Sequence, residues 1–199
     1  MSVPILLASG SEIRQILLRN AGVSFSVQPA RVDEDAIKAA MMAENAPARD
    51  IADALAQAKA RKVSQKSPGA LVIGCDQVLE CGGTILSKPE NREMVRAQLD
   101  YLNAASHKLL SAAVIYLDGQ PQWRHVGTAR LTMRASSESY LDNYLDRNWD
   151  SIKTSVGCYK LEEEGVRLFS RIEGDYFTVL GLPLTELLGY LTVRGDLAG

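Results

Sequence analysis

The first residues that suggest chemistry are two serines and an arginine in the turn after the opening apolar segment. Residues 3–8 are almost wholly apolar, and residues 12–21 have the spacing of a helix. A strand that runs straight into a helix leaves backbone N–H groups free at the turn, where they attract anions. The hydroxyl groups of Ser9 and Ser11 and the guanidinium of Arg14 would complete an anion-binding pocket. The alternative, which the pattern alone favours, is that Ser11 merely caps the helix.

Asp76 is the strongest single candidate for a functional residue, because it follows the continuous apolar run of residues 70–75. Such a run is typical of a central strand covered on both faces. Ligands of open α/β sheets bind at the carboxyl ends of strands, where a carboxylate can bind a divalent metal or orient a water molecule. A turn-capping role for Asp76 is the alternative. If the strand continues, Gln77 points to the opposite face of the sheet.

Two lysines are further candidates for binding an anion, and a group of acids is a further candidate for binding a metal. Lys59 lies among Ala and Leu residues of a helical segment, where a lysine is unexpected, although an ordinary solvated helix face is the alternative. Lys88 precedes Pro89, which favours an extended backbone before a helix, so its ammonium could reach an anion held there, although an ordinary surface lysine is the commoner alternative. Within the acidic segment 33–35, Glu34 or a neighbouring acid would join Asp76 at a metal, unless these charges are only solvated.

The cysteines and histidines carry weaker signals. The three cysteines lack zinc-binding spacing and fit reduced thiols of a cytoplasmic protein. Cys75 as a nucleophile is disfavoured, because it lies in a strand-like run without a histidine nearby in the sequence. His107 and His125 have no ligand partner at useful spacing, and we expect His107 to form a structural hydrogen bond.

Composition narrows the classes of protein. The net charge of −2 gives no basic surface for a nucleic-acid polymer, although a small anion needs only a local cluster of cations. No apolar stretch reaches the length that spans a membrane, and no secretion signal is recognisable. The 199 residues are enough for one well-packed domain or two small lobes. We therefore expect a cytoplasmic protein without a membrane or nucleic-acid partner.

Strand and helix patterns alternate along the chain, which predicts an α/β fold with a mixed sheet. The expected helices are residues 12–21, 36–44, 48–63, 89–102, 138–145 and 184–193. The expected strands are residues 3–8, 24–27, 70–76, 109–117, 125–133, 167–172 and 176–180, with a hairpin over residues 78–86.

Several short motifs, taken in order, resemble those of the Maf family of nucleoside triphosphate pyrophosphatases. The resemblance covers essentially the whole chain, and the motifs are individually weak but strong together. They are Leu7-Ala8-Ser9-Gly10-Ser11 with Arg14, Val32-Asp33-Glu34, Ala56-Gln57-Ala58-Lys59-Ala60, Gly74-Cys75-Asp76, Lys88-Pro89, Gly157-Cys158-Tyr159, Ile172-Glu173-Gly174-Asp175-Tyr176 and Gly181-Leu182-Pro183-Leu184.

Four positions resemble one subgroup of that family more than another. Members similar to dTTP/UTP pyrophosphatases carry Arg, Thr and Gln where this chain has Ile13, Gln77 and Glu162. The residues found here, with Lys160 two positions before Glu162, resemble the 7-methyl-GTP pyrophosphatases. The chemistry agrees, because a carboxylate accepts from the N–H groups of guanine and favours the positive charge of a 7-methylated base.

The resemblance implies a metal-dependent hydrolase that splits a nucleoside triphosphate into a monophosphate and pyrophosphate. Mg²⁺ or Mn²⁺ would be held by Asp76 and Glu34, and Asp76 would activate a water molecule that the cation has made more acidic. The positive charges of Arg14, Lys59 and Lys88 would balance the developing negative charge. Ser9 and Ser11 would fix the phosphates.

The same resemblance implies the architecture. Residues 1–199 would form a single Maf-like domain, elongated and two-lobed as in Maf and ITPase-like folds, with a central mixed sheet flanked by helices and one cleft. It also implies a homodimer. Glu12 departs from the usual Pro and places a negative charge beside the phosphate turn.

Two other functions compete with this expectation. The chain could be a nucleotide-binding regulator of cell division or septum formation with little catalysis. It could also be a related house-cleaning enzyme for other bases, including the canonical pyrimidine triphosphates dTTP and UTP. Pyrophosphate release separates an enzyme from a regulator, and a panel of triphosphates compared by kcat/KM separates the enzymes.

Overall fold

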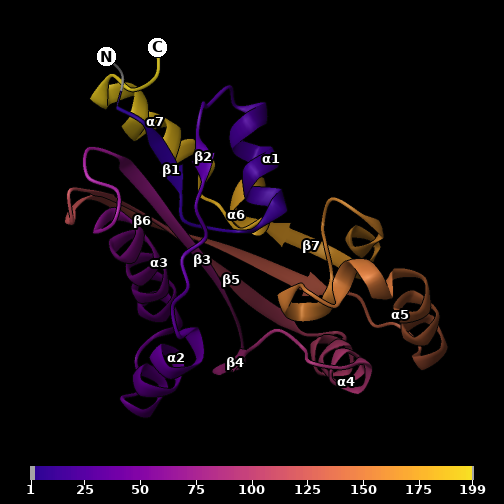
Figure 1. Cartoon of the computed structure of the whole chain (residues 1–199). Helices are drawn as coiled ribbons and strands as arrows, with labels where there is room; N and C mark the ends of the chain where they lie inside the picture. Colours follow the sequence, from indigo (N-terminus) through magenta and orange to yellow (C-terminus); the bar gives the residue numbers. More distant parts are fainter. Residues whose placement is uncertain (1–2, 199) are drawn as a thin grey trace. The chain divides into compact units, whose positions relative to one another are not determined.

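The computed structural model describes residues 3–198, which form an α/β fold around a seven-stranded mixed sheet (Figure 1), as predicted. The sheet has the order β2-β1-β3-β5-β6-β7, and β4 pairs with β3 outside this path. The strands are β1 (Ile5–Leu7), β2 (Ser26–Val27), β3 (Leu71–Cys81), β4 (Thr84–Leu86), β5 (Ser106–Leu117), β6 (Gln120–Met133) and β7 (Phe169–Glu173). The helices are α1 (Glu12–Asn20), α2 (Glu34–Ala43), α3 (Ala48–Ser64), α4 (Arg92–Leu102), α5 (Glu138–Ile152), α6 (Tyr176–Val179) and α7 (Leu184–Arg194), with 3-10 helices η1 (Val156–Cys158) and η2 (Glu164–Leu168).

The chain divides into two compact units. The first unit comprises residues 1–77, 110–127 and 176–199, and the second comprises residues 78–109 and 128–175. Strands β3, β5 and β6 each contribute residues to both units. The expectation of a single domain with one cleft stays a prediction.

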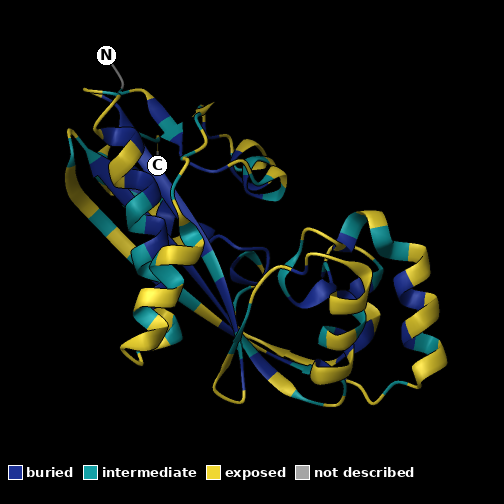
Figure 2. Cartoon of the chain, turned by 60° about the horizontal axis from the view of Figure 1, so that its bottom comes forward, coloured by how far each residue is buried: buried dark blue, intermediate teal, exposed yellow. Residues whose placement is uncertain are grey.

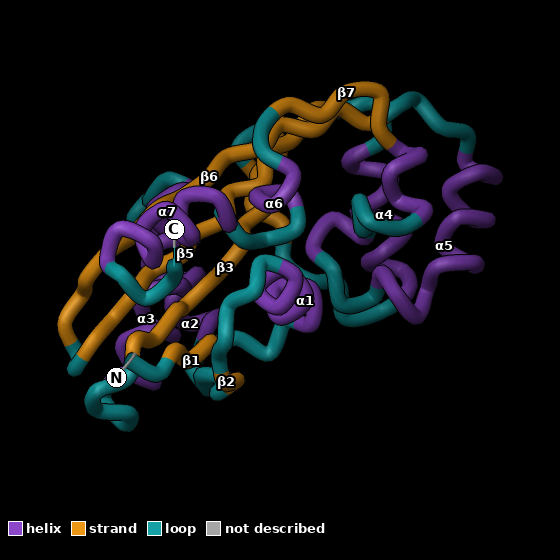
Figure 3. Tube along the Cα trace, turned by 90° about the horizontal axis from the view of Figure 1, so that it is seen from above, coloured by secondary structure: helices purple, strands orange, loops and turns teal. Residues whose placement is uncertain are grey.

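The first unit is built on parallel strands. β1 pairs in parallel with β2 and β3, and Leu7 lies opposite both Val27 and Ile73. Helix α3 covers one face of these strands and α7 covers the other (Figures 1 and 3). Because both faces are covered, residues 71–76 of β3 are buried without interruption. A run of this kind is the pattern expected for a central parallel strand.

The second unit is built on antiparallel pairing and two packed helices. β3 and β4 form a hairpin through Gly82 and Gly83, and β6 pairs antiparallel with β7. Helices α4 and α5 pack against each other. Figure 2 shows α5 with a buried side and a long exposed side, as an amphipathic helix at a surface requires.

Three sequence predictions about these elements were wrong. Residues 176–180 were expected to be a strand, but α6 is a short helix over Tyr176–Val179. Asp76 was expected at a strand end, but β3 continues to Cys81, so Asp76 lies in the middle of the strand. The helix expected from Pro89 begins at Arg92, because the Asn91 side chain caps it by accepting from Met94 N.

The remaining helices occur close to the predicted ranges, with α5 extending beyond residue 145 to Ile152. Strand β2 is shorter than expected. In the part of the chain that the structure describes, no helix combines the length and the apolar character needed to cross a lipid bilayer.

Candidate active site

A close approach between helix α3 and strand β3 creates the candidate site in the first unit. A Cβ atom added to Gly74 would lie 2.2 Å from the Ala56 carbonyl oxygen and 2.6 Å from Ala60 N, so only glycine leaves room for the helix backbone. Side chains alternate along a strand, so Asp76 points to the same face as Gly74. Lys59 lies on the neighbouring turn of α3, and this contact brings it onto Asp76.

Lys59 joins two carboxylates. Its Nζ donates to Asp76 Oδ1 at 2.7 Å and lies 2.9 Å from Glu34 Oε1. The side chains of Lys59 and Asp76 are only 10% and 9% exposed, whereas that of Glu34 is 42% exposed. A buried ammonium group needs such partners, because desolvation of an unpaired charge is costly. The interpretation of Lys59 as a solvated surface residue is therefore wrong.

The three acids of segment 33–35 have different roles. Asp33 caps α2, since its Oδ1 accepts from Ala36 N at 3.0 Å. Asp35 is exposed in the first turn of the helix. Glu34 is the acid that the structure brings to Lys59, and its role at a metal stays a prediction.

Arg14 is buried and is held by neutral acceptors. Its Nε donates to the Gly181 carbonyl at 2.8 Å, and its Nη1 donates to Ser9 Oγ at 3.2 Å and to the Cys75 carbonyl at 3.1 Å. All three acceptors are neutral oxygen atoms, and one of them belongs to Cys75, the residue that precedes Asp76.

Ser11 occupies the N-cap position of α1, but its side chain forms no capping hydrogen bond. Its backbone N donates instead to Ser9 Oγ at 3.3 Å. Glu12 is exposed in the first turn of α1, and Ile13 is half-buried. The simple capping interpretation of Ser11 is thus not supported, and its hydroxyl stays a candidate phosphate ligand.

Gln77 points away from the Lys59 group. Its Nε2 donates to Ser111 Oγ at 2.9 Å and to the carbonyl oxygens of Thr178 and Val179 at 3.2 and 3.0 Å. These partners belong to β5 and α6, on the face opposite α3. The sequence correctly predicted that Gln77 points to the sheet face opposite Asp76. Ser111 was not among the predicted site residues, although it is the one polar residue in the run 109–115.

Cys75 is unsuited to nucleophilic chemistry. The residue is fully buried, and burial raises the pKa of its thiol to about 11. A thiolate is the reactive form, so the thiol is inert near neutral pH. The sequence-based preference against this nucleophile agrees with the structure.

The residues fit a hard divalent cation. Asp76 and Glu34 offer carboxylate oxygens, which Mg²⁺ and Mn²⁺ prefer. The described residues contain no group of three or more His, Cys, Asp or Glu side chains arranged around a common point. Mg²⁺ commonly binds through one or two carboxylates, with water and substrate phosphates as its other ligands, so two carboxylates suffice.

The other predicted residues lie in the second unit. Lys88 and Glu162 are exposed, and Lys160 is half-buried with its Nζ 3.1 Å from Glu163 Oε1. The Gly165 backbone approaches Lys160 so closely that an added Cβ would lie 2.4 Å from the Lys160 carbonyl oxygen. The loop over residues 160–165 is therefore tightly folded, and the roles of these three side chains stay predictions.

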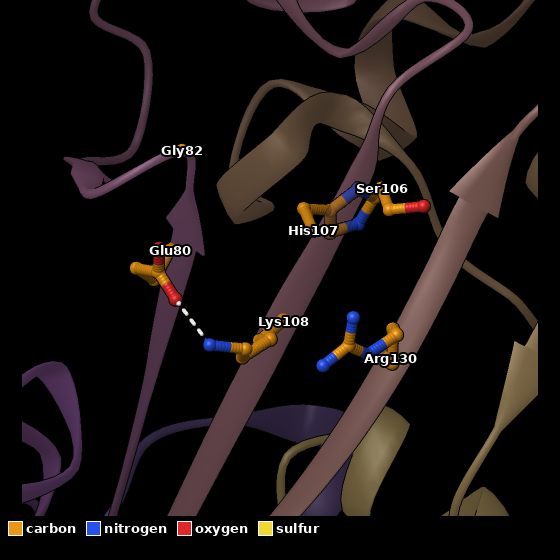
Figure 4. Close-up of a pocket in the computed structure, with 6 residues that line it drawn as sticks. All are labelled: Glu80, Gly82, Ser106, His107, Lys108 and Arg130. Atoms are coloured by element: carbon orange, nitrogen blue, oxygen red, sulfur yellow. Dashed lines mark hydrogen bonds and ion pairs between the residues drawn. The ribbon is translucent and has the colours of Figure 1, made fainter.

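A depression of about 230 Å³ in the second unit contains none of the predicted site residues (Figure 4). Lys108 pairs with Glu80 across it at 3.1 Å, and Arg130 lines it from β6. The Gly83 N–H, which donates to Glu80, and then Lys108 hold the pKa of Glu80 below its ordinary value. This arrangement of charged side chains is typical of the solvated face of an antiparallel sheet rather than of a catalytic site.

His107 beneath this surface forms the structural hydrogen bond that the sequence predicted. Its Nε2 lies 2.7 Å from the Tyr159 hydroxyl, and its ring also contacts Phe169. Burial lowers the pKa of His107 to about 4, so the ring is neutral near pH 7.

The fold and this site define a class: an α/β protein in which two buried cationic side chains, one buried carboxylate and one exposed carboxylate lie near a hydroxyl-rich turn. The family follows from comparison with known sequences. The family model described as Maf-like protein matches residues 4–193, and the chain belongs to the Maf family.

Similar proteins extend over almost the full length of the chain. A nucleoside triphosphate pyrophosphatase of Ruegeria pomeroyi is 62% identical over 195 residues, which cover 98% of each protein. Another from Caulobacter vibrioides is 52% identical and covers 98% of this chain and 97% of the relative. A 7-methyl-GTP pyrophosphatase of Brucella abortus is 46% identical over 191 residues, or 96% of each protein.

Proposed function

We propose that this protein is a nucleoside triphosphate pyrophosphatase that hydrolyses a modified, 7-methyl-GTP-like nucleotide to the monophosphate and pyrophosphate. The general activity is supported by the family and by the names of relatives that match nearly the whole chain. The observation that carries the proposal is the contact of Lys59 with the buried Asp76 and the more exposed Glu34, since it places an ammonium group and two carboxylates together.

In the proposed reaction, Asp76 orients a water molecule and accepts its proton. The water oxygen forms a bond to the α-phosphorus, while the bond from that phosphorus to the bridging oxygen breaks and pyrophosphate leaves. Arg14 and Lys59 offset the negative charge that develops, and Ser9 and Ser11 hold phosphate oxygens. Lys88 is proposed to bind the leaving phosphates.

We propose that Asp76 and Glu34 also hold Mg²⁺ or Mn²⁺. When bound, such a cation offsets phosphate charge and makes water more acidic. Lys59 then has a second task, because its ammonium keeps the two carboxylates together before the cation and substrate arrive.

The 7-methyl-GTP preference is the finer part of the proposal. It is supported by Ile13, Gln77 and Glu162 with Lys160, and by the name of the Brucella relative. Glu162 would accept hydrogen bonds from the guanine N–H groups and attract the positive charge of the methylated ring.

The test measures pyrophosphate release by the purified protein with Mg²⁺ or Mn²⁺ over a panel of 7-methyl-GTP, GTP, dTTP and UTP. Turnover with the highest kcat/KM for 7-methyl-GTP supports the proposal. Nucleotide binding without pyrophosphate release would instead favour the regulator of cell division. A higher kcat/KM for dTTP or UTP would favour the pyrimidine enzyme.

We further propose a cytoplasmic homodimer, on the basis of the family resemblance and of three buried free cysteines. Light scattering of the purified protein tests the dimer, and cell fractionation tests the compartment.

A further inference from the structure

The amide of Gln77 is enclosed by acceptors on one side. Ser111 is fully buried on β5, and its hydroxyl donates to the Thr178 carbonyl at 2.7 Å. Gln77 Nε2 donates to Ser111 Oγ and to the carbonyls of Thr178 and Val179. We call Ser111 and these two carbonyl groups the amide clamp.

The chemistry of the amide clamp permits one orientation of the Gln77 amide. Backbone carbonyls only accept hydrogen bonds, so the NH₂ end of the amide must face them. The proton of Ser111 is already directed to Thr178, so Ser111 Oγ accepts from Gln77 rather than donating to it. The alternative, in which the amide oxygen faces the clamp, would place the Thr178 and Val179 carbonyl oxygens against another acceptor.

The oxygen end of Gln77 faces outward. No described residue donates a hydrogen bond to its Oε1, and this atom is not among the buried polar atoms without a partner. Gln77 is half-buried, so its outward atom reaches solvent as a fixed acceptor.

The segment that contains Thr178 and Val179 also contacts Arg14, the arginine of the proposed phosphate site. Gly181, two residues after Val179, accepts from Arg14 Nε at 2.8 Å. Carbonyl groups at the end of a helix lack partners within the helix. Those of Thr178 and Val179 accept from the side chains of Gln77 and Ser111, and Thr178 also accepts from Gly181 N, whereas the Gly181 carbonyl beyond the helix accepts from Arg14. Figures 1 and 3 show α6 beside α1, in agreement with this contact.

We propose that Ser111 is a positioning residue that fixes Gln77 as an acceptor toward the nucleobase. This inference rests on the proposed function. A fixed acceptor selects a base edge that presents N–H donors, as guanine and 7-methylguanine do at N1 and the exocyclic amine. A base that presents an acceptor there leaves the Gln77 oxygen without a hydrogen bond. The free-energy cost of that unpaired group disfavours such a base.

The experiment compares Ser111→Ala with Ser111→Thr. Ser111→Ala removes one of the three acceptors of the Gln77 amide and loosens its hold, and it should reduce the ratio of kcat/KM between 7-methyl-GTP and UTP by about fivefold to tenfold. Ser111→Thr keeps the hydroxyl and should retain the wild-type ratio. Gln77→Glu places a carboxylate against the clamp and should reduce the ratio at least as much as Ser111→Ala.

A second measurement does not depend on activity. In ¹⁵N-labelled wild type the Gln77 side-chain NH₂ should exchange slowly with solvent, and this exchange should become faster in Ser111→Ala, which keeps only the two carbonyl acceptors. An unchanged base ratio or unchanged amide protection in Ser111→Ala overturns the proposal. If the wild type hydrolyses none of the triphosphates, the proposed function fails, whereas the exchange measurement still decides whether the clamp fixes the amide.

Discussion

Lys59 Nζ lies 2.7 Å from Asp76 Oδ1, and neither residue is more than 10% exposed. The two side chains come from helix α3 and strand β3, which are in direct backbone contact at Gly74. Because Gly74 has no side chain, the helix and the strand approach closely there, and this approach places the Lys59 ammonium against the Asp76 carboxylate.

Gly74→Ala should both destabilise the protein and abolish its activity. The added Cβ would meet the Ala56 carbonyl at 2.2 Å, so α3 must move away from β3. We expect the free energy of unfolding to fall by about 3 kcal/mol or more, measured by urea denaturation. Gly189→Ala in α7 is the control, because nothing lies within 4 Å of its added Cβ. An unfolding free energy equal to wild type in Gly74→Ala would show that the contact is not tight.

Asp76→Asn should retain the fold and lose turnover. The amide has the shape of the carboxylate but cannot accept the proton of the attacking water, so kcat should fall about 100-fold or more. Pyrophosphate release measures this effect, and circular dichroism checks the fold. Asp35→Asn removes an exposed carboxylate from the same acidic segment as Glu34 and should leave turnover unchanged. Normal turnover in Asp76→Asn would refute the assigned role.

Lys59→Met should destabilise the protein because it leaves Asp76 buried without its cation. Breaking a buried ion pair from one side costs about 3–5 kcal/mol. The double variant Lys59→Met with Asp76→Asn should lose less stability than the sum of the two single variants, because the uncompensated charge is gone. Strictly additive losses of unfolding free energy would mean that the two side chains do not interact.

The sequence singled out Lys59, Glu34 and Asp76 as candidates, although their local pattern favoured a solvated face for Lys59 and for the acidic segment. The structure places the Lys59 ammonium against both carboxylates. The segment Tyr176–Val179 has aromatic and β-branched residues that favour a strand locally. It is a helix whose terminal carbonyls bind Gln77, Ser111 and, through Gly181, Arg14. Such contacts span more than sixty residues of sequence, and no local pattern encodes them.

The stability of the protein should depend on pH through His107. Burial lowers its pKa from 6.5 to about 4, so the unfolded chain binds more protons than the native state between these values. Stability therefore rises with pH across this window, and up to about 3 kcal/mol is lost as the pH falls from 6.5 to 4. Urea denaturation at pH 4.5 and pH 7 measures the difference. His107→Gln should reduce the pH dependence, whereas His125→Gln should retain it, and equal dependence in both variants would contradict the assignment to His107.

Gly181→Ala should raise the KM for the nucleotide, beyond the loss of stability that it shares with a control variant. Gly181 has a φ of +98°, and an added Cβ would lie 3.4 Å from both Nε and Nη2 of Arg14. The backbone strain alone costs about 1–2 kcal/mol. Gly195→Ala is the matched control, because Gly195 has a φ of +88° and an added Cβ there meets nothing within 4 Å. Both variants should lose similar stability, but only Gly181→Ala should show a raised KM, since its backbone strain acts at the residue whose carbonyl holds Arg14 Nε. A KM equal to that of the Gly195 variant would mean that the position of Arg14 does not determine how tightly the phosphates bind.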